Sequence, residues 1–256
     1  MFQTNFSFYG LFIIIAIICG LVIVYMNLKF LKFKKEETIG LLLYIALGCI
    51  FGAKYYTYFV NYQKYNGFFN FVRMGLSSYG AIIGILFMLL LFSKQYKKNF
   101  KDLLCILLPA IPFMYAVGKI GCFFAGCCYG IEYNGFLNVT YNYSAIAPKG
   151  ISLFPIQLLE SIVFLIIFLY TFIKFHKVDI DKNIFIGQTF IICGVAKFFL
   201  DYLRSSHVGL FLSINQIFSI TFILVGLILV IKSKMFCFNL WYILTWIKLR
   251  FMINYG

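Results

Sequence analysis

Seven apolar segments constrain this chain more than any other feature of its sequence, because most are long enough to cross a lipid bilayer. A bilayer core about 30 Å thick requires about 20 predominantly apolar residues of α-helix. The segments cover residues 8–28, 39–60, 78–93, 103–117, 155–175, 184–203 and 212–231. With 63% hydrophobic residues, the chain is too apolar for a soluble domain. We therefore predict an all-α polytopic membrane protein, one transmembrane domain over residues 1–256 with seven spans, the fourth kinked at Pro109 and Pro112.

The basic residues predict the orientation of these spans. Fifteen of the 22 lysine and arginine residues fall on alternate connections and in the tail: Lys29, Lys32, Lys34, Lys35, Lys94, Lys97, Lys98, Lys101, Lys174, Lys177, Lys182, Lys232, Lys234, Lys248 and Arg250. The positive-inside rule makes that side cytoplasmic, with the N-terminus outside and the C-terminus inside. Topology thus explains the net charge of +14 better than nucleic-acid binding does. Residues 235–253 are predicted as an interfacial helix, with an eighth span as the alternative.

Topology leaves seven cations unexplained, all on the outer side or in the outer half of spans: Lys54, Lys64, Arg73, Lys119, Lys149, Lys197 and Arg204. Charges inside a span are costly and usually face a partner or a cavity. Glu160 and Asp201 lie just inside spans five and six, and Lys197, Asp201 and Arg204 share one helix face by spacing. We therefore predict an outward-facing, positively charged cavity suited to phosphate, with a structural salt bridge as the alternative; its residues are Lys54, Lys119, Lys197, Arg204, Glu160 and Asp201.

The segment Gly118–Gly130 contains four glycines, three cysteines and Lys119, and opens an outer-side segment over residues 119–153. We expect irregular backbone lining a cavity here. Cys122, Cys127 and Cys128 could pack or form a structural disulfide, line a lipid pocket, or act as a redox centre. The segment has neither a C-x-x-C pair nor a nearby histidine, which are typical of zinc sites, so no metal is predicted. His207, in the outer loop beside Arg204, is interpreted as a solvated loop histidine, with a general base as the alternative.

Seven fragments of the chain, in order, resemble the prolipoprotein diacylglyceryl transferase family. The family patterns W-Y-G-L, G-A-R-x-x-Y-V-x-F-Y-N, G-M-S-F-H-G-G, G-R-x-G-N-F-x-N-G-E-x-x-G, H-P-x-Q-L-Y-E, R-F-x-x-E-x-x-R and L-S-x-G-Q are matched at residues 8–11, 52–61, 75–81, 118–130, 154–160, 197–204 and 212–216. The likeness covers nearly the whole chain.

The resemblance implies transfer of diacylglyceryl from phosphatidylglycerol to the lipobox cysteine of a lipoprotein precursor, at the outer face of the bacterial cytoplasmic membrane and without a cofactor. The partners implied are the phospholipid, the signal peptide of the precursor and the bilayer. The matching positions imply catalytic roles for Tyr79, Lys119, Glu160, Lys197 and Arg204. Substrate-binding positions would be Tyr9, Lys54, Gly118, Gly121, Cys122, Gly126, Cys127, Gly130, Gln157, Asp201 and Gln216.

The chain departs from the family pattern mainly at the chemistry. Lysine replaces arginine at 119 and 197, Asp201 replaces glutamate, and Tyr79 replaces histidine. Cys122 and Ala125 stand for the two asparagines, and Cys127 for the glutamate. A divergent paralogue with another acceptor, a membrane thiol oxidoreductase and a non-catalytic lipid binder or transporter are therefore the alternatives.

Overall fold

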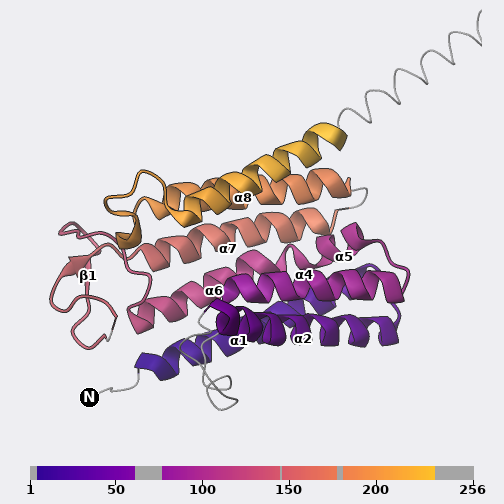
Figure 1. The fold of residues 1–256 in the computed structure, drawn as a ribbon, viewed down its shortest axis with the longest axis horizontal. Helices are drawn as coiled ribbons and strands as arrows, with labels where there is room; N and C mark the ends of the chain where they lie inside the picture. Colours follow the sequence, from indigo (N-terminus) through magenta and orange to yellow (C-terminus); the bar gives the residue numbers. More distant parts are fainter. Residues whose placement is uncertain (1–4, 61–76, 145, 178–180, 234–256) are drawn as a thin grey trace, which may run out of the picture. The chain divides into compact units, whose positions relative to one another are not determined.

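The computed structural model describes residues 5–60, 77–144, 146–177 and 181–233 (Figure 1). The chain divides into two compact units. Unit 1 contains residues 1–20 and 108–256, and unit 2 contains residues 21–107. Lys64, Arg73 and the tail over 235–253 lie outside the described residues. The single transmembrane domain stays a prediction.

Helices dominate the described residues. They are α1 (Asn5–Phe30), α2 (Lys35–Val60), α4 (Ser78–Gln95), α5 (Phe100–Leu107), α6 (Ala110–Ala125), α7 (Ile156–Phe175), α8 (Lys182–Asp201), the short η1 (Ser205–His207) and a final helix Ile214–Ser233. Six stretches of the described chain are long and apolar enough to cross a membrane, with α5 and α6 counted together. The apolar part of α4, Gly80–Gln95, is shorter. The protein is thus a multi-pass helical membrane protein, whereas the seventh span and the orientation stay predictions.

The fourth predicted span is interrupted at Pro109, one of the two prolines at which a kink was predicted. Residues 108 and 109 form a turn between α5 and α6, because proline lacks the N–H that would continue the helix. Pro112 falls in the first turn of α6, where a backbone N–H would have no helical carbonyl to bond, so proline is tolerated there. Within unit 2, the buried Asn27 side chain donates to the Ile106 carbonyl at 2.7 Å and satisfies an acceptor at the end of α5.

In unit 2, α2 and α4 pack closely through glycines. A Cβ atom added to Gly84 would lie 2.1 Å from the Gly48 carbonyl oxygen, and one added to Gly52 would lie 2.3 Å from the Gly80 carbonyl oxygen. Only glycine allows the two backbones to approach this closely. The pair therefore forms a tight two-helix element built on Gly-x-x-x-Gly spacing in both helices.

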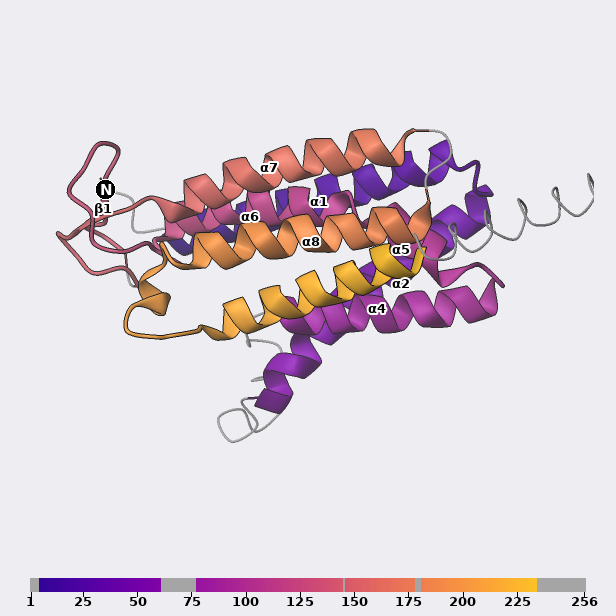
Figure 2. The ribbon, with the colours of Figure 1, turned by 90° about the horizontal axis from the view of Figure 1, so that it is seen from above.

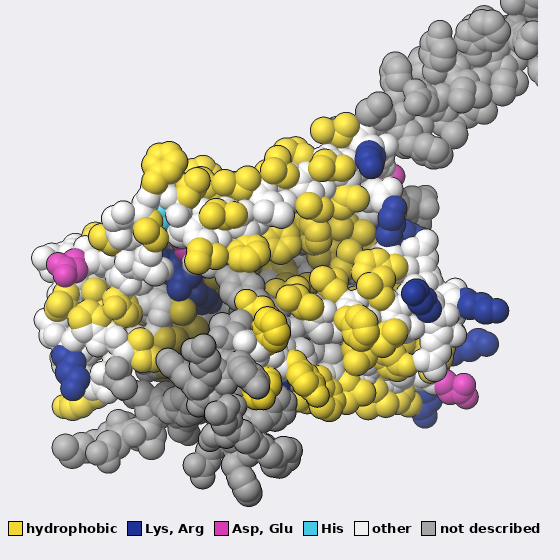
Figure 3. All heavy atoms as spheres, viewed as in Figure 1, with side chains coloured by type: hydrophobic (Ala, Val, Ile, Leu, Met, Phe, Trp, Pro, Cys, Tyr) yellow, Lys and Arg dark blue, Asp and Glu magenta, His cyan; other side chains and the backbone are white. Residues whose placement is uncertain are grey.

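In unit 1, α7 lies beside both α6 and α8 (Figures 1 and 2). Its exposed large side chains recur at helical spacing, at Ile162, Ile166, Leu169 and Ile173. Its other face buries Phe164 and Ile167 in a core shared with Ala116 and Leu200. Hydrophobic side chains also cover much of the face drawn over α7 and α8 in Figure 3. This pattern is that of a bundle that buries a few polar groups inside and presents apolar residues to lipid.

A loop between α6 and α7 carries the only strands among the described residues, β1 (Val139–Thr140) and β2 (Ser152–Leu153). They pair antiparallel, with Val139 opposite Leu153. Their loop lies at the end of unit 1 where α7 begins (Figure 1). The strands therefore form a small two-stranded sheet at one end of the helices.

Candidate functional site

The centre of the candidate site is Glu160 on α7, which is fully buried. Lys119 on α6 places its Nζ 2.6 Å from Oε2 of this carboxylate, and Lys197 on α8 pairs with Oε1. Each of the three helices thus contributes one charge. Two ammonium groups share one carboxylate, so the trio carries an excess of one positive charge in a buried setting. The sequence prediction that Lys119, Glu160 and Lys197 come together is consistent with these contacts.

Tyr115 is a member of this cluster that the sequence reasoning missed. Its hydroxyl accepts from Nζ of Lys197 at 2.6 Å and donates to Oε1 of Glu160 at 3.0 Å. Nζ of Lys119 and of Lys197 also lie 5.1 and 5.2 Å from the centre of its ring, within range of a cation–π contact. The signal was available, because Tyr115 precedes Lys119 by four residues and so shares its helix face.

Asp201 is the centre of a second buried polar group, at the C-terminal end of α8. Its carboxylate accepts from Nδ2 of Asn215 at 3.0 Å and from Oγ of Ser213. Nη1 of Arg204 lies 3.8 Å from it. The helix-face spacing of the sequence suggested Lys197 as a partner of Asp201, but Lys197 pairs with Glu160 and α8 ends before Arg204.

The first residues of the loop between α6 and α7 position Arg204. Gly130 and Arg204 form an antiparallel bridge, with the Ile131 N–H donating to the Leu203 carbonyl at 3.1 Å. Burial lowers the pKa of Arg204, but the nearby charges of Cys128, Glu160, Tyr115 and Asp201 outweigh it, so the pKa lies above its usual value. Arg204 is therefore a permanent cation within electrostatic range of the Glu160 cluster. Its Nε is buried and has no hydrogen-bond partner in the described structure.

The glycine-rich segment is irregular, as predicted, only over residues 126–130. Residues 118–125 continue α6 instead of forming irregular backbone. A Cβ atom at Gly121 would lie 2.8 Å from Cβ of Phe12, so this glycine permits close packing of α1 rather than breaking the helix. Gly118 has more room, since a Cβ atom there would make an ordinary 3.8 Å contact with Ile13. Glycine has both uses, and the sequence does not show which applies.

Gly126 ends α6. It adopts the left-handed conformation (φ 66°), and its N–H donates to the Phe123 carbonyl at 3.2 Å while the Cys127 N–H donates to the Cys122 carbonyl at 3.1 Å. These two bonds make a Schellman motif, which commonly ends helices with glycine in this position. At Gly130, a Cβ atom would lie 2.4 Å from the Phe154 carbonyl oxygen, so this position of the loop also requires glycine.

Two predicted glutamines are fully buried nearby. Nε2 of Gln157 donates to the Cys127 carbonyl at 2.9 Å, so it ties α7 to the turn after α6. Its Oε1 has no hydrogen-bond partner in the described structure. Gln216 accepts from the Ser213 N–H at 3.1 Å and therefore supports the loop that contacts Asp201. Because Gln157 is fully buried, leaving its Oε1 without a hydrogen bond costs free energy. A ligand that donates a hydrogen bond to this oxygen would recover that free energy.

A sequence model of the family described as prolipoprotein diacylglyceryl transferase matches residues 1–232. The chain belongs to this family. A relative from Clostridium perfringens named phosphatidylglycerol–prolipoprotein diacylglyceryl transferase 2 is 35% identical over 158 residues, which are 60% of each chain. The transferase of Finegoldia magna is 29% identical over 240 residues, or 91% of this chain and 94% of the relative. The aligned regions of the Clostridium perfringens and Clostridium tetani relatives cover 60% and 62% of their lengths.

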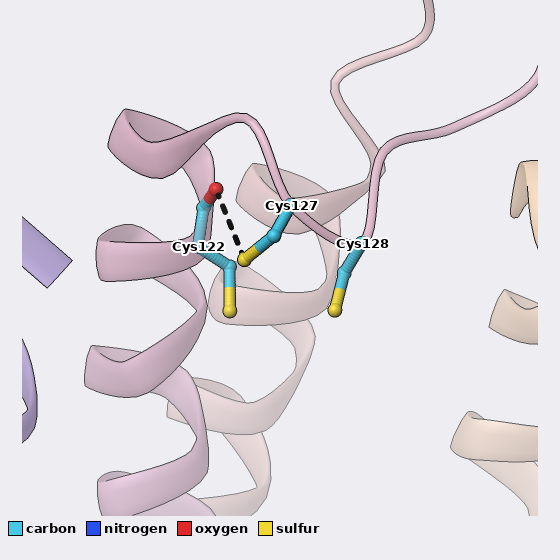
Figure 4. Close-up of side chains that lie close together, drawn as sticks. All are labelled: Cys122, Cys127 and Cys128. Atoms are coloured by element: carbon cyan, nitrogen blue, oxygen red, sulfur yellow. Dashed lines mark hydrogen bonds between the residues drawn. The ribbon is translucent and has the colours of Figure 1, made fainter. Parts of the chain in front are cut away.

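Cys122 and Cys127, which replace polar residues of the family pattern, lie together with Cys128 (Figure 4). The Sγ atoms of Cys122, Cys127 and Cys128 are all within 4.8 Å of one another. Cys122 is buried and the other two are half-buried. The neighbouring thiols of Cys122 and Cys127, together with Lys119 and Arg204, lower the pKa of Cys128. Among the described residues, this is the group that could hold a metal ion.

Several other predicted residues fall into clear positions. His207 was interpreted as solvated, but it is buried; its Nδ1 lies 3.7 Å from Asp201, and its ring contacts that of Tyr202. The loop after α8 therefore folds back over the end of that helix. Tyr9 lies on α1 with its carbonyl oxygen near Gly121. Lys54 on α2 and the backbone of Tyr79 on α4 belong to unit 2, and the Tyr79 side chain lies outside the described structure.

Proposed function

We propose that this protein transfers the diacylglyceryl group of phosphatidylglycerol to the lipobox cysteine thiol of a lipoprotein precursor. The reaction would take place at the outer face of the bacterial cytoplasmic membrane. Family membership and the names of the relatives support the reaction class. They favour transfer over the thiol oxidoreductase considered from the sequence. The distribution of lysines between alternate connections supports the orientation.

The observation that carries the proposal is the excess positive charge around Glu160. Lys119 and Lys197 share this one carboxylate, and Arg204 lies within electrostatic range. An anionic phosphate would neutralise the excess, and cations that bind the departing phosphate stabilise the charge that develops as the carbon–oxygen bond breaks. Lys119, Lys197 and Arg204 would therefore hold the phosphate, while Glu160 and Asp201 position them.

The other predicted residues would complete the substrate site. Tyr79 would handle the proton in place of the family's histidine, and Tyr9 and Lys54 would shape the pocket. The backbone from Gly121 to Gly130 would lie along the headgroup, with the buried acceptor of Gln157 available to a glycerol hydroxyl. Gln216 would act through the loop that contacts Asp201.

Purified protein with phosphatidylglycerol vesicles and a lipobox peptide tests the proposal. We expect release of glycerol phosphate and a peptide carrying diacylglycerol on its cysteine, both detected by mass spectrometry. Lys119→Met and Arg204→Ala should lower the rate about 10²–10³-fold, the usual cost of removing one group that stabilises developing charge. Lys149→Met is the matched control, because Lys149 is an exposed cation in the loop between α6 and α7, away from the Glu160 cluster.

Arg204→Lys separates charge from geometry. Lysine keeps the positive charge but lacks the planar guanidinium fork, so its rate should lie between that of the native protein and that of Arg204→Ala. Lipid binding without release of glycerol phosphate would contradict the proposal and favour a lipid binder. Equal rates for the native protein, Lys119→Met and Arg204→Ala would show that these cations do not hold the leaving group.

A further inference from the structure

The three clustered cysteines have the geometry of a metal site with three protein ligands. All three Sγ atoms lie within 4.8 Å of one another. Zinc–sulfur bonds of about 2.3 Å at tetrahedral angles separate two bound sulfurs by about 3.8 Å, so small side-chain shifts would suffice to bind one zinc ion. In Figure 4 the side chains of Cys122 and Cys128 point the same way, and that of Cys127 points toward Cys122. We propose that Cys122, Cys127 and Cys128 bind zinc and leave its fourth coordination position for the acceptor thiol.

The backbone fixes these three positions firmly. The Schellman motif at Gly126 returns the chain over the last turn of α6, which places Cys127 above Cys122. Cys128 then adopts a left-handed φ of 53°, a conformation that a residue with a side chain rarely takes. Gln157 holds the Cys127 carbonyl from α7. A strained residue held by its surroundings beside two further thiols indicates that their convergence has a use other than filling space.

The surrounding charges suit a zinc–thiolate centre. Three thiolates and Zn²⁺ carry a net charge of −1, and Lys119 and Arg204 lie close enough to act on Cys128 electrostatically. A soft thiolate set of this kind selects zinc or copper(I) over magnesium or calcium. Cys127 and Cys128 are only half-buried, so the centre has an accessible side. Catalytic zinc sites combine three protein ligands with one open position in the same way.

The proposed zinc would deprotonate the acceptor thiol, a step for which this chain has Tyr79 in place of the family's histidine. This consequence rests on the proposed function. The acceptor thiol would bind the open position as a thiolate and release its proton to water, because zinc deprotonates a coordinated thiol. Its sulfur would form the new carbon–sulfur bond to the glycerol carbon of the phospholipid. The carbon–oxygen bond to phosphate would break, and its electron pair would leave with glycerol phosphate. No electron transfer and no oxidant are involved.

Zinc analysis of the full-length protein, purified in detergent with a reductant and without chelators, tests the site directly. We expect one zinc per protein. Cys127→Ser combined with Cys128→Ser should lower the zinc content at least about 10-fold, since even loss of a supporting contact costs 10–100-fold in metal affinity. Cys193→Ser, a cysteine within α8, is the control and should keep the zinc. Zinc at background in the native protein, or a disulfide between any two of the three cysteines, would overturn the proposal.

Cobalt(II) replacement tests the open position independently of activity. The cobalt protein should show sulfur-to-cobalt charge-transfer absorption, which a lipobox peptide should change and the same peptide with serine for cysteine should not. An unchanged spectrum would show that the acceptor thiol does not bind the metal.

The transfer assay separates failure of this site from failure of the proposed function. Cysteine-dependent zinc without release of glycerol phosphate would refute the transferase function and leave the metal site standing. Transfer at the native rate in zinc-free protein and in the double serine variant would refute the catalytic zinc site and leave the function standing.

Discussion

Replacing Glu160 with glutamine should destabilise the protein strongly. Glu160 is fully buried and serves two cations, with Nζ of Lys119 at 2.6 Å and Lys197 on its other oxygen. The amide of glutamine carries no charge, so the buried ammonium group of Lys119 and the half-buried one of Lys197 would face each other without a counter-ion. Removing one partner of a buried ion pair typically costs about 3–5 kcal/mol. At about 2–4 °C per kcal/mol for a chain of this size, Tm should fall by about 6–20 °C.

Thermal unfolding in detergent, followed by circular dichroism, measures this loss. Glu37→Gln is the matched control, because Glu37 also pairs with a lysine, Lys98 at 2.9 Å, but in a more exposed position. Exposed pairs contribute about 0–1 kcal/mol, so the control should change Tm by no more than about 4 °C. Combining Glu160→Gln with Lys197→Met should recover part of the loss, since one uncompensated charge is removed. Equal Tm values for Glu160→Gln and Glu37→Gln would refute the buried charge cluster.

Three further substitutions test other parts of the structure. Gly126→Ala should lower stability by about 1–2 kcal/mol from left-handed strain, and more because its Cβ atom would lie 2.5 Å from Oγ of Ser144; thermal unfolding measures this. Gly84→Leu should separate α2 from α4 at Gly48 and cost about 1–3 kcal/mol or more, measured in the same way. Burial raises the pKa of Tyr141 from 10.0 to about 12, so the stability this phenol contributes should be lost between pH 10 and 12; Tyr141→Phe should remove that loss in alkaline unfolding curves.

Gly10 supplies the control for both glycine substitutions. It lies in α1, and a Cβ atom there would meet nothing within 4 Å. Gly10→Ala and Gly10→Leu should therefore leave Tm unchanged or raise it slightly, because alanine and leucine favour helix over glycine. If the Gly10 variants lose as much stability as Gly126→Ala and Gly84→Leu, close packing is not the reason for those losses.

Charge in an apolar segment was the most informative sequence signal for the site. Lys119, Glu160 and Lys197 could be predicted to lie together because an unpaired charge in a span is so costly that a partner must be near. The same rule did not specify the pairing, and the helix spacing pointed to Asp201 as the partner of Lys197. Which helix faces which is decided by packing between elements distant in sequence, and local periodicity carries no such information.

The glycine-rich segment and the loop after α8 show where sequence reasoning ended. Gly121 permits close approach of Phe12, whereas Gly126 is required by its positive φ, and both read simply as glycine in the sequence. His207 follows the end of α8, which favoured a solvated position, yet the returning chain buries it beside Asp201. In both places the outcome depends on what packs against the residue. By contrast, Pro109 acts through its own covalent structure, and its break was predictable.

The order of synthesis leaves the buried charges without partners for a time. Tyr115 and Glu160 are separated by 45 residues, which take about 2–9 s to translate at 5–20 residues per second. During that interval α6 can enter the membrane with Lys119 before either α7 or α8 has been made. A lone lysine at the centre of a span costs about 2.5–3.5 kcal/mol on the insertion scale. Lys119 lies nearer the end of its span, so the apolar remainder of α6 must offset up to that amount by itself. The nascent chain is therefore most vulnerable to retention or degradation in the seconds before Glu160 leaves the ribosome.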